Sequence, residues 1–456
     1  MLTIRNRRAF LKIGGLTLGG LTLPGLIAAR EDSRQLVTGK SVILLFLHGG
    51  PSQIETFDPK MSAPVGVRST TGQVATKLSG VSFGGSFPKL AALADKLTIV
   101  RSYVPGDANH DIKPIVCKDS FGGNLGAVYA RMAGVNNPTN GMPSNVVLFP
   151  QAVDPSTGPS QTAFGRFGDT GPFGPASAPF DPSGPGQSQK DMRLAISLDR
   201  LDDRRQLLAK LDQVKWSLSE KKMIESLDQT RQQAFDTILG GVTDAFDLTK
   251  EGDRVVGRYD TAPLVRPENI DKKWKNYNYY VDNAKSLGKL LLLARRLCER
   301  GCGFVTVTTN FVWDMHSDVN NAGVAEGMRY MGGPLDHALS AFIEDVEARG
   351  LSDKILLVVC GEMGRTPKVN NGGGRDHWGN LGPLLLAGGG LNMGMVIGQS
   401  TRDASEPATE PVRIKNLIAT VLSTLFHVPE LRFVPGAPRE VATTMTGWDP
   451  IPELHG

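Results

Sequence analysis

The sequence predicts an α/β fold with a doubly wound, mostly parallel sheet sandwiched by helices. Short runs such as Phe304–Thr309 and Ile355–Cys360 are almost continuously apolar or β-branched, as in strands buried on both faces. These runs alternate with helical segments, which is the pattern of βαβ units. At 456 residues the chain can bury one large core or two moderate ones.

Apolar runs give the expected strands in chain order. The first, Ser41–Leu47, ends at the sharp break His48–Ser52, and the last, Pro383–Gly390, ends in three glycines. The strands are expected over 41–47, 97–101, 145–149, 304–309, 355–360 and 383–390.

Helical periodicity fills the intervals between these strands. Leu335, Leu339 and Phe342 lie on one stripe of a segment that Gly350 ends, and Gly301 follows another helix as a C-terminal cap. Within one domain of residues 30–456 we expect a Pro-, Gly- and Ser-rich loop over 150–190 that covers the site. A polar helical insertion is expected over 191–250. The other helices are predicted over 87–96, 276–300, 334–349 and 412–426.

The N-terminus has the pattern of an export leader. Arg7 and Arg8 precede Phe10-Leu11-Lys12 and an apolar stretch over 13–29, which is typical of a twin-arginine signal peptide. For a stable membrane span, this stretch is short, and glycines interrupt it. We therefore expect export by the twin-arginine machinery, a periplasmic or extracellular location, and no transmembrane span in the mature form. The alternative is an uncleaved anchor or a basic N-terminus packed on the domain.

Charge and cysteine content exclude some classes of function. The formal net charge is +4, but residues 1–29 hold four basic residues and no acid, so the mature chain is neutral. No basic field therefore argues for nucleic acid as a partner. Of the four cysteines, Cys298 and Cys302 are four residues apart without a second pair at metal-type spacing. We expect buried free thiols, with a Cys298–Cys302 disulfide as the alternative.

Side chains beside three of the strands have the types that bind a divalent metal. Asp314 and His316 are two residues apart, so an extended segment turns both to the same side. Glu362 follows the strand 355–360, at the edge where open α/β sheets bind ligands. Asp376 and His377 precede the last strand, so a loop must bring them back to that edge. We predict that these five residues bind Zn, Mn, Ca or Mg, although surface hydrogen bonding also explains an isolated Asp-x-His pair.

Three further residues are predicted to act in catalysis. Arg365 either fixes the Glu362 carboxylate or holds a phosphate or sulfate anion. Ser52 follows two glycines whose N–H groups can approach an anion, and it can be an orienting hydroxyl or the nucleophile. His110 is a general acid or base, or else a buried structural histidine.

These residues lie in motifs that resemble the DUF1501 family of exported bacterial proteins of unknown function. The resemblance runs from about Ser41 to Pro429 and includes the leader. Its motifs are Gly49–Lys60, Asn109-His110, Trp313–His316, Gly361–Pro367, Gly374–Trp378 and Ala387–Gly390.

The family resembles a branch of the alkaline phosphatase and sulfatase superfamily, which implies a doubly wound fold with one or two metals. In that resemblance Asp314 and His316 match the Asp and His after one strand, Glu362 an acidic residue after the next, and His377 a later His. The chain departs from the pattern at Met363, where a His is expected, and at His48–Gly50, where a carboxylate is expected. The usual nucleophile motif is absent as well.

The sequence thus predicts an exported, metal-dependent hydrolase of phosphate or sulfate esters, acting on a small molecule or a glycan. The alternative on the same scaffold is a non-catalytic envelope protein that binds sulfated or phosphorylated glycans. A structural envelope protein is a third possibility, and it leaves the clustered Asp and His residues without a purpose.

Overall fold

A computed structural model describes residues 36–183, 242–433 and 439–455 of the chain. The predicted leader over 1–29 and most of the predicted helical insertion over 191–250 lie outside these ranges. Between 150 and 183 the chain forms only short 3-10 turns, at Pro150–Ala152, Gly171–Phe173 and Pro175–Ser177.

A seven-stranded sheet forms the middle of the molecule, in the order β12-β4-β11-β8-β1-β7-β6. Every strand runs in the same direction except β11, which is antiparallel to both β4 and β8. This confirms the predicted mostly parallel sheet. The strands are β1 (Ser41–Phe46), β4 (Thr98–Val100), β6 (Asn145–Leu148), β7 (Phe304–Thr308), β8 (Ile355–Cys360), β11 (Leu384–Gly388) and β12 (Met395–Ile397). Three two-stranded ribbons accompany it: β2 (Gln73–Ala75) with β3 (Ser82–Gly84), β5 (Tyr103–Val104) with β13 (Val412–Arg413), and β9 (Gly364–Arg365) with β10 (His377–Trp378).

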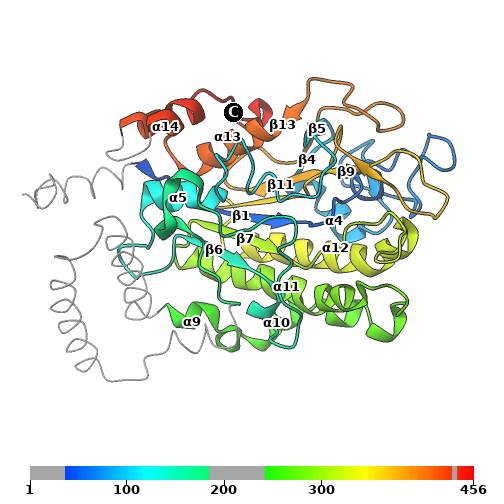
Figure 1. Ribbon diagram of the computed structural model, residues 1–456, viewed down its shortest axis with the longest axis horizontal. Coiled ribbons are helices and arrows are strands. Elements are labelled where there is room, and N and C mark those ends of the chain that lie inside the picture. The colour runs from blue at the N-terminus through cyan, green and yellow to red at the C-terminus, as the bar shows by residue number, and fades with distance from the viewer. Residues whose placement is uncertain (1–35, 184–241, 434–438, 456) are drawn as a thin grey trace, which may run out of the picture.

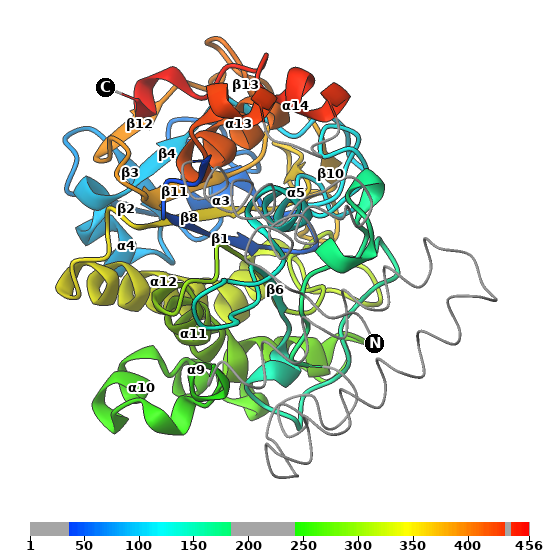
Figure 2. The same ribbon diagram turned by 90° about the vertical axis from the view of Figure 1, so that its left-hand side faces the viewer.

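Helices cover both faces of the sheet (Figures 1 and 2). In β1, Ile43 and Leu45 join the core under α11 and α12, whereas Val42 and Leu44 join the core under α5 and α13. This division explains why the strand is apolar at every position. One face carries α4 (Pro88–Ala92), α9 (Thr243–Phe246), α10 (Asp253–Tyr259), α11 (Tyr277–Glu299) and α12 (Val324–Ala348). The other carries α5 (Leu125–Ala133), α13 (Ile414–Leu425) and α14 (Arg439–Met445), and the short α3 (Gln53–Thr56) follows β1.

The largest difference from the predicted elements is the start of α12. This helix begins at Val324 rather than at Pro334, which lies inside it. The Gly332-Gly333-Pro334 sequence has the composition of a helix break, but Met328 and Met331 before it are buried in the same core as Leu335 after it. Packing against α11 therefore outweighs the low local helix propensity.

Two smaller predictions concern cysteines and membrane spans. All four cysteines are free thiols, and Cys298, Cys302 and Cys360 are buried. None of the helices within the described ranges is long and apolar enough to cross a bilayer.

Candidate metal centre

Polar residues gather where the central strands end. The chain leaves β1 at His48-Gly49-Gly50, β7 at the segment that carries Asp314, and β8 at the segment that carries Glu362. Because these three strands are parallel neighbours, their following segments meet at one edge of the sheet.

The direction of β11 explains how His377 reaches this edge. Since β11 is antiparallel to β8, its first residue, Leu384, lies beside Cys360 at the end of β8. The segment that leads into β11 therefore lies at the site. The pairing of β10 with β9 places His377 opposite Arg365. The predicted return loop is not needed, because the strand itself is reversed.

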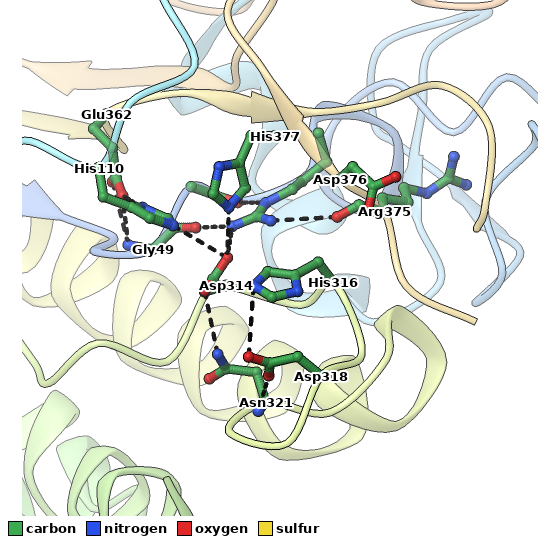
Figure 3. Close-up of polar contacts among 12 residues, drawn as sticks. Gly49, His110, Asp314, His316, Asp318, Asn321, Glu362, Arg375, Asp376 and His377 are labelled. Atoms are coloured by element: carbon green, nitrogen blue, oxygen red, sulfur yellow. Dashed lines mark hydrogen bonds and ion pairs between the residues drawn. The ribbon is translucent and has the colours of Figure 1, made fainter. Parts of the chain in front are cut away.

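Asp314 lies at the centre of the site, with 4% of its surface exposed. Its Oδ1 accepts hydrogen bonds from Arg365 Nη2 at 2.6 Å and from His377 Nε2 at 3.2 Å. Its Oδ2 bonds His316 Nε2 at 2.9 Å and accepts a hydrogen bond from Asn321 Nδ2 at 3.2 Å. Figure 3 shows His316, Asn321 and His377 turned towards the Asp314 carboxylate.

His110 joins the group from the segment after β5. Its Nδ1 lies 2.9 Å from Glu362 Oε1, which fixes the orientation of the ring. Its Nε2 lies 3.4 Å from Asp314 Oδ1, yet is buried and has no hydrogen-bond partner among the described residues. The ligand atoms of His110, Asp314 and His377 all lie within 4.8 Å of one another.

Glu362 is fully buried and held by backbone as well as by His110. The N–H of Gly49 donates to both of its oxygens, at 3.0 and 3.2 Å. Gly49 has a φ of +115°, and a Cβ there would lie 2.5 Å from the backbone nitrogen of Asp314, so no side chain fits. The predicted anion near these glycines is thus the carboxylate of the protein's own Glu362.

The charges of the site shift its pKa values in consistent directions. Burial alone raises the pKa of Asp314, but the neighbouring His110, the hydrogen bonds with His316 and His377 and the charge of Arg365 hold it well below its usual range. The bond to Asp314 raises the pKa of His316 above its usual value. For His110, burial lowers the pKa, and the two carboxylates outweigh it and raise the pKa.

The donor set fits a divalent metal. Imidazole nitrogen together with carboxylate oxygen suits Zn or Mn, whereas Ca and Mg favour ligand sets made of oxygen. The Nε2 of His110 is buried and has no hydrogen-bond partner among the described residues, so its lone pair is available to bind an ion. Glu362 gives His110 the carboxylate partner that metal-binding histidines commonly have on their other nitrogen.

The predicted metal ligands divide into three groups. Asp314 and His377 belong to the group with His110, and His316 lies next to it on the other oxygen of Asp314. Glu362 orients His110 instead of facing the centre. Asp376 is exposed and its carboxylate accepts a hydrogen bond from Asn370 at 2.9 Å, so its placement argues against a ligand role.

Two predicted catalytic residues have structural contacts instead. Ser52 is buried at the N-cap of α3, where its hydroxyl accepts a hydrogen bond from Glu55 N at 3.3 Å. Arg365 is fully buried. Its guanidinium donates to Gly49 O, to Gly50 O at 2.7 Å, to Arg375 O at 3.3 Å and to Asp314. It therefore fixes Asp314, rather than Glu362 or an external anion.

His48 and Asn321 were missed by the sequence reasoning as site residues. His48 is 1% exposed, its Nε2 has no partner within the described chain, and burial lowers its pKa. Its place two residues after the end of β1 was the available signal. Asn321 contacts Asp314 from seven residues further along, and no sequence pattern marks it.

Comparisons with known proteins give a family and distant structural similarities. A family model described as "Protein of unknown function (DUF1501)" matches residues 39–451. A comparison with curated proteins gave no match.

Among solved structures, the chain is similar to the PsFucS1 sulfatase from Pseudoalteromonas sp., with 11% identity, coverage of 87% of this chain and 70% of that chain, and a TM-score of 0.36. The phosphonate monoester hydrolase SpPMH from Silicibacter pomeroyi has 11% identity, coverage of 84% and 73%, and a TM-score of 0.31. At these TM-scores we draw no conclusion from either similarity.

Proposed function

Because the chain belongs to the DUF1501 family, whose description assigns no activity, we propose from its own residues that it is an exported, metal-dependent hydrolase of phosphate or sulfate esters. The observation that carries this proposal is the convergence of His110, Asp314 and His377 within 4.8 Å at the edge of the sheet. Export rests on the leader sequence. The class of ester rests on the resemblance of the motifs to the alkaline phosphatase and sulfatase superfamily.

His110, Asp314 and His377 would hold the metal, with Zn favoured by the two imidazoles and Mn by the carboxylate. When bound, such an ion polarises an ester oxygen and lowers the pKa of water. Arg365 holds Asp314 in place, and Glu362 fixes the ring of His110, whose Nε2 would bind the ion.

His316 is suited to transfer a proton to the leaving group. Its side chain is 25% exposed, and its bond to Asp314 Oδ2 raises its pKa above the usual value. Since Ser52 is buried and caps α3, we propose direct attack by water without a covalent enzyme intermediate. Water forms the new bond to phosphorus or sulfur and loses a proton to solvent, the ester bond breaks, and the departing alkoxide takes the proton of His316, which solvent then protonates again.

The alternative, a non-catalytic protein that binds sulfated or phosphorylated glycans, also agrees with the role of Ser52 as a helix cap. In that case the same metal would bind the anionic group of the glycan without hydrolysis. Turnover decides between the two.

The test combines metal analysis with turnover. We expect purified full-length protein to retain Zn or Mn near one equivalent and to hydrolyse an aryl phosphate or an aryl sulfate. His110→Ala and His377→Ala should lose both properties. His427→Ala, at an exposed histidine outside the site, is the matched control. Metal retention without turnover, together with binding of a sulfated polysaccharide, would favour the alternative. Stoichiometric metal in both site variants would refute the ligand assignment.

A further inference from the structure

Two stacked phenylalanines lie against the histidines of the site. The rings of Phe164 and Phe311 are 4.7 Å apart between centroids and inclined by 29°. Phe164 lies 5.1 Å from the ring of His110 and 5.7 Å from that of His48. Phe311 lies 4.8 Å from His110 and 5.0 Å from His48. Since His110 belongs to the metal group, this pair of rings borders the place where an ester would bind.

The two rings differ in exposure. Phe311 is 5% exposed and precedes Asp314 by three residues, so it belongs to the wall of the site. Phe164 is only half-buried, and it comes from the Pro- and Gly-rich segment after β6. A partly open aromatic ring beside a polar centre leaves apolar surface available to a ligand.

The backbone around Phe164 is held firmly in position. The next residue, Gly165, has a φ of +149°, and a Cβ there would lie 2.7 Å from Ile112 Cγ1, two residues beyond His110. Three residues further on, Phe167 is buried against Phe149, with ring centroids 5.4 Å apart. Phe164 is therefore a preorganised ring, because its segment packs on both sides.

We propose that Phe164 determines specificity by stacking on a flat ring carried by the alcohol part of the ester. This ring can be an aryl group or a sugar, because both present an apolar face on which Phe164 can stack. Aromatic rings gain about 0.5–1.5 kcal/mol from stacking beyond burial, which corresponds to roughly a two- to twelvefold change in affinity. This inference rests on the proposed function, since it assigns the anionic group of the same ligand to the metal.

Non-hydrolysable ligands test the proposal without requiring turnover. Binding of phenylphosphonate and methylphosphonate to the metal-loaded full chain is measured by calorimetry. We expect the unaltered protein to favour phenylphosphonate about three- to tenfold, Phe164→Ala to lose that preference, and Phe164→Trp to keep it. Phe180→Ala is the matched control, because Phe180 is a half-buried ring of the same segment that contacts Phe246 and none of the site histidines.

The outcomes separate this inference from the proposed function. Equal binding of both phosphonates, or an undiminished preference in Phe164→Ala, would overturn the role of Phe164 if Phe164→Ala also has no effect in the sugar arm below, and it would leave the hydrolase proposal intact. Binding of neither phosphonate would overturn both. A second arm compares a hexose 6-sulfate with inorganic sulfate, and an effect of Phe164→Ala in that arm alone would assign the ring to a sugar.

Discussion

Two buried carboxylates near the same edge of the sheet, Asp314 and Glu55, are each paired with a buried arginine. Asp314 bonds Arg365 at 2.6 Å, and Glu55 bonds Arg375 at 2.9 Å. Both arginines and Glu55 are 0% exposed, and the Asp314 side chain is 6% exposed. From burial and charge alone the two pairs are alike.

The other donors around the carboxylates differ. Glu55 also accepts hydrogen bonds from Ser69 Oγ at 2.9 Å and from both the N–H and the hydroxyl of Thr70 at 3.0 Å. Those donors carry no titratable proton near neutral pH. Glu55 and Arg375 therefore form a closed structural pair that fixes the chain two residues before His377.

Asp314, in contrast, contacts the imidazole nitrogens of His110, His316 and His377. These groups can give up a proton and bind a metal in its place. A buried carboxylate is thus structural when fixed donors saturate it, and can form a metal site when imidazoles surround it. Four predictions test this contrast, beginning with the largest expected effect.

Glu55→Ala leaves Arg375 buried without its carboxylate, and we expect it to lower the free energy of unfolding by about 3–5 kcal/mol. Urea unfolding followed by fluorescence measures this change. Lys77→Ala is the matched control, because it removes an exposed ion pair with Asp95 and should change stability by less than about 1 kcal/mol. A similarly small loss of stability in both variants would show that the Glu55–Arg375 pair is not the structural element that we describe.

Glu362→Gln is expected to weaken metal binding by about 10- to 100-fold, because Glu362 orients His110 rather than binding the ion. Competition with a chelator of known affinity measures the change. Asp376→Asn alters the other acid that the sequence predicted as a ligand, and we expect no change there, since Asp376 faces Asn370. Loss of metal in Asp376→Asn would restore that residue as a ligand.

Metal affinity and the stability of metal-free protein should respond to pH in opposite ways. The pKa values of His110 and His316 are raised in the folded state, so their stabilising effect is complete below about 6.5 and is lost as pH rises through the folded pKa values. Metal affinity should rise with pH, by up to about tenfold per unit for each proton displaced. Thermal unfolding with and without chelator at pH 6 and pH 8 measures both trends. If the chelator lowers the unfolding temperature more at pH 6 than at pH 8, this prediction is contradicted.

Ser52→Ala removes the N-cap of α3, and we expect a loss of about 0.5–2 kcal/mol in stability with metal content and turnover unchanged. Denaturant unfolding and the aryl ester assays measure these quantities. If turnover disappears while the protein remains folded and metal-loaded, Ser52 is the nucleophile and the proposed direct attack by water is wrong.

Much of the fold was predictable because its signals are local. The run Ile355–Cys360 gives the bounds of β8, and Tyr277–Glu299 lies within one residue of the helix expected over 276–300. Local signals failed where packing opposed them, as at Pro334 inside α12. The short helix α5 was missed, since its nine residues give only about two and a half turns of helical periodicity.

The site was predictable in its residue types but not in their partners. Asp314, His316 and His377 were predicted as ligands from their positions next to strands, and they do lie together. Arg365 was predicted either to fix Glu362, three residues away, or to hold an anion, yet its side chain reaches Asp314, 51 residues away in sequence. Such pairings depend on distances between segments that sequence spacing does not report.

The sequence alone determined that strands buried on both faces alternate with helices and that acids and histidines follow them, because apolar runs and residue types are properties of the chain itself. The tertiary structure alone decided that β11 runs against its neighbours, which brings His377 to the edge where β8 ends. It also decided that His110 joins Asp314 in the group and that Ser52 caps a helix. The physical reason is that strand direction and hydrogen-bond partners are fixed by contacts between distant segments, and these form only when the whole core packs.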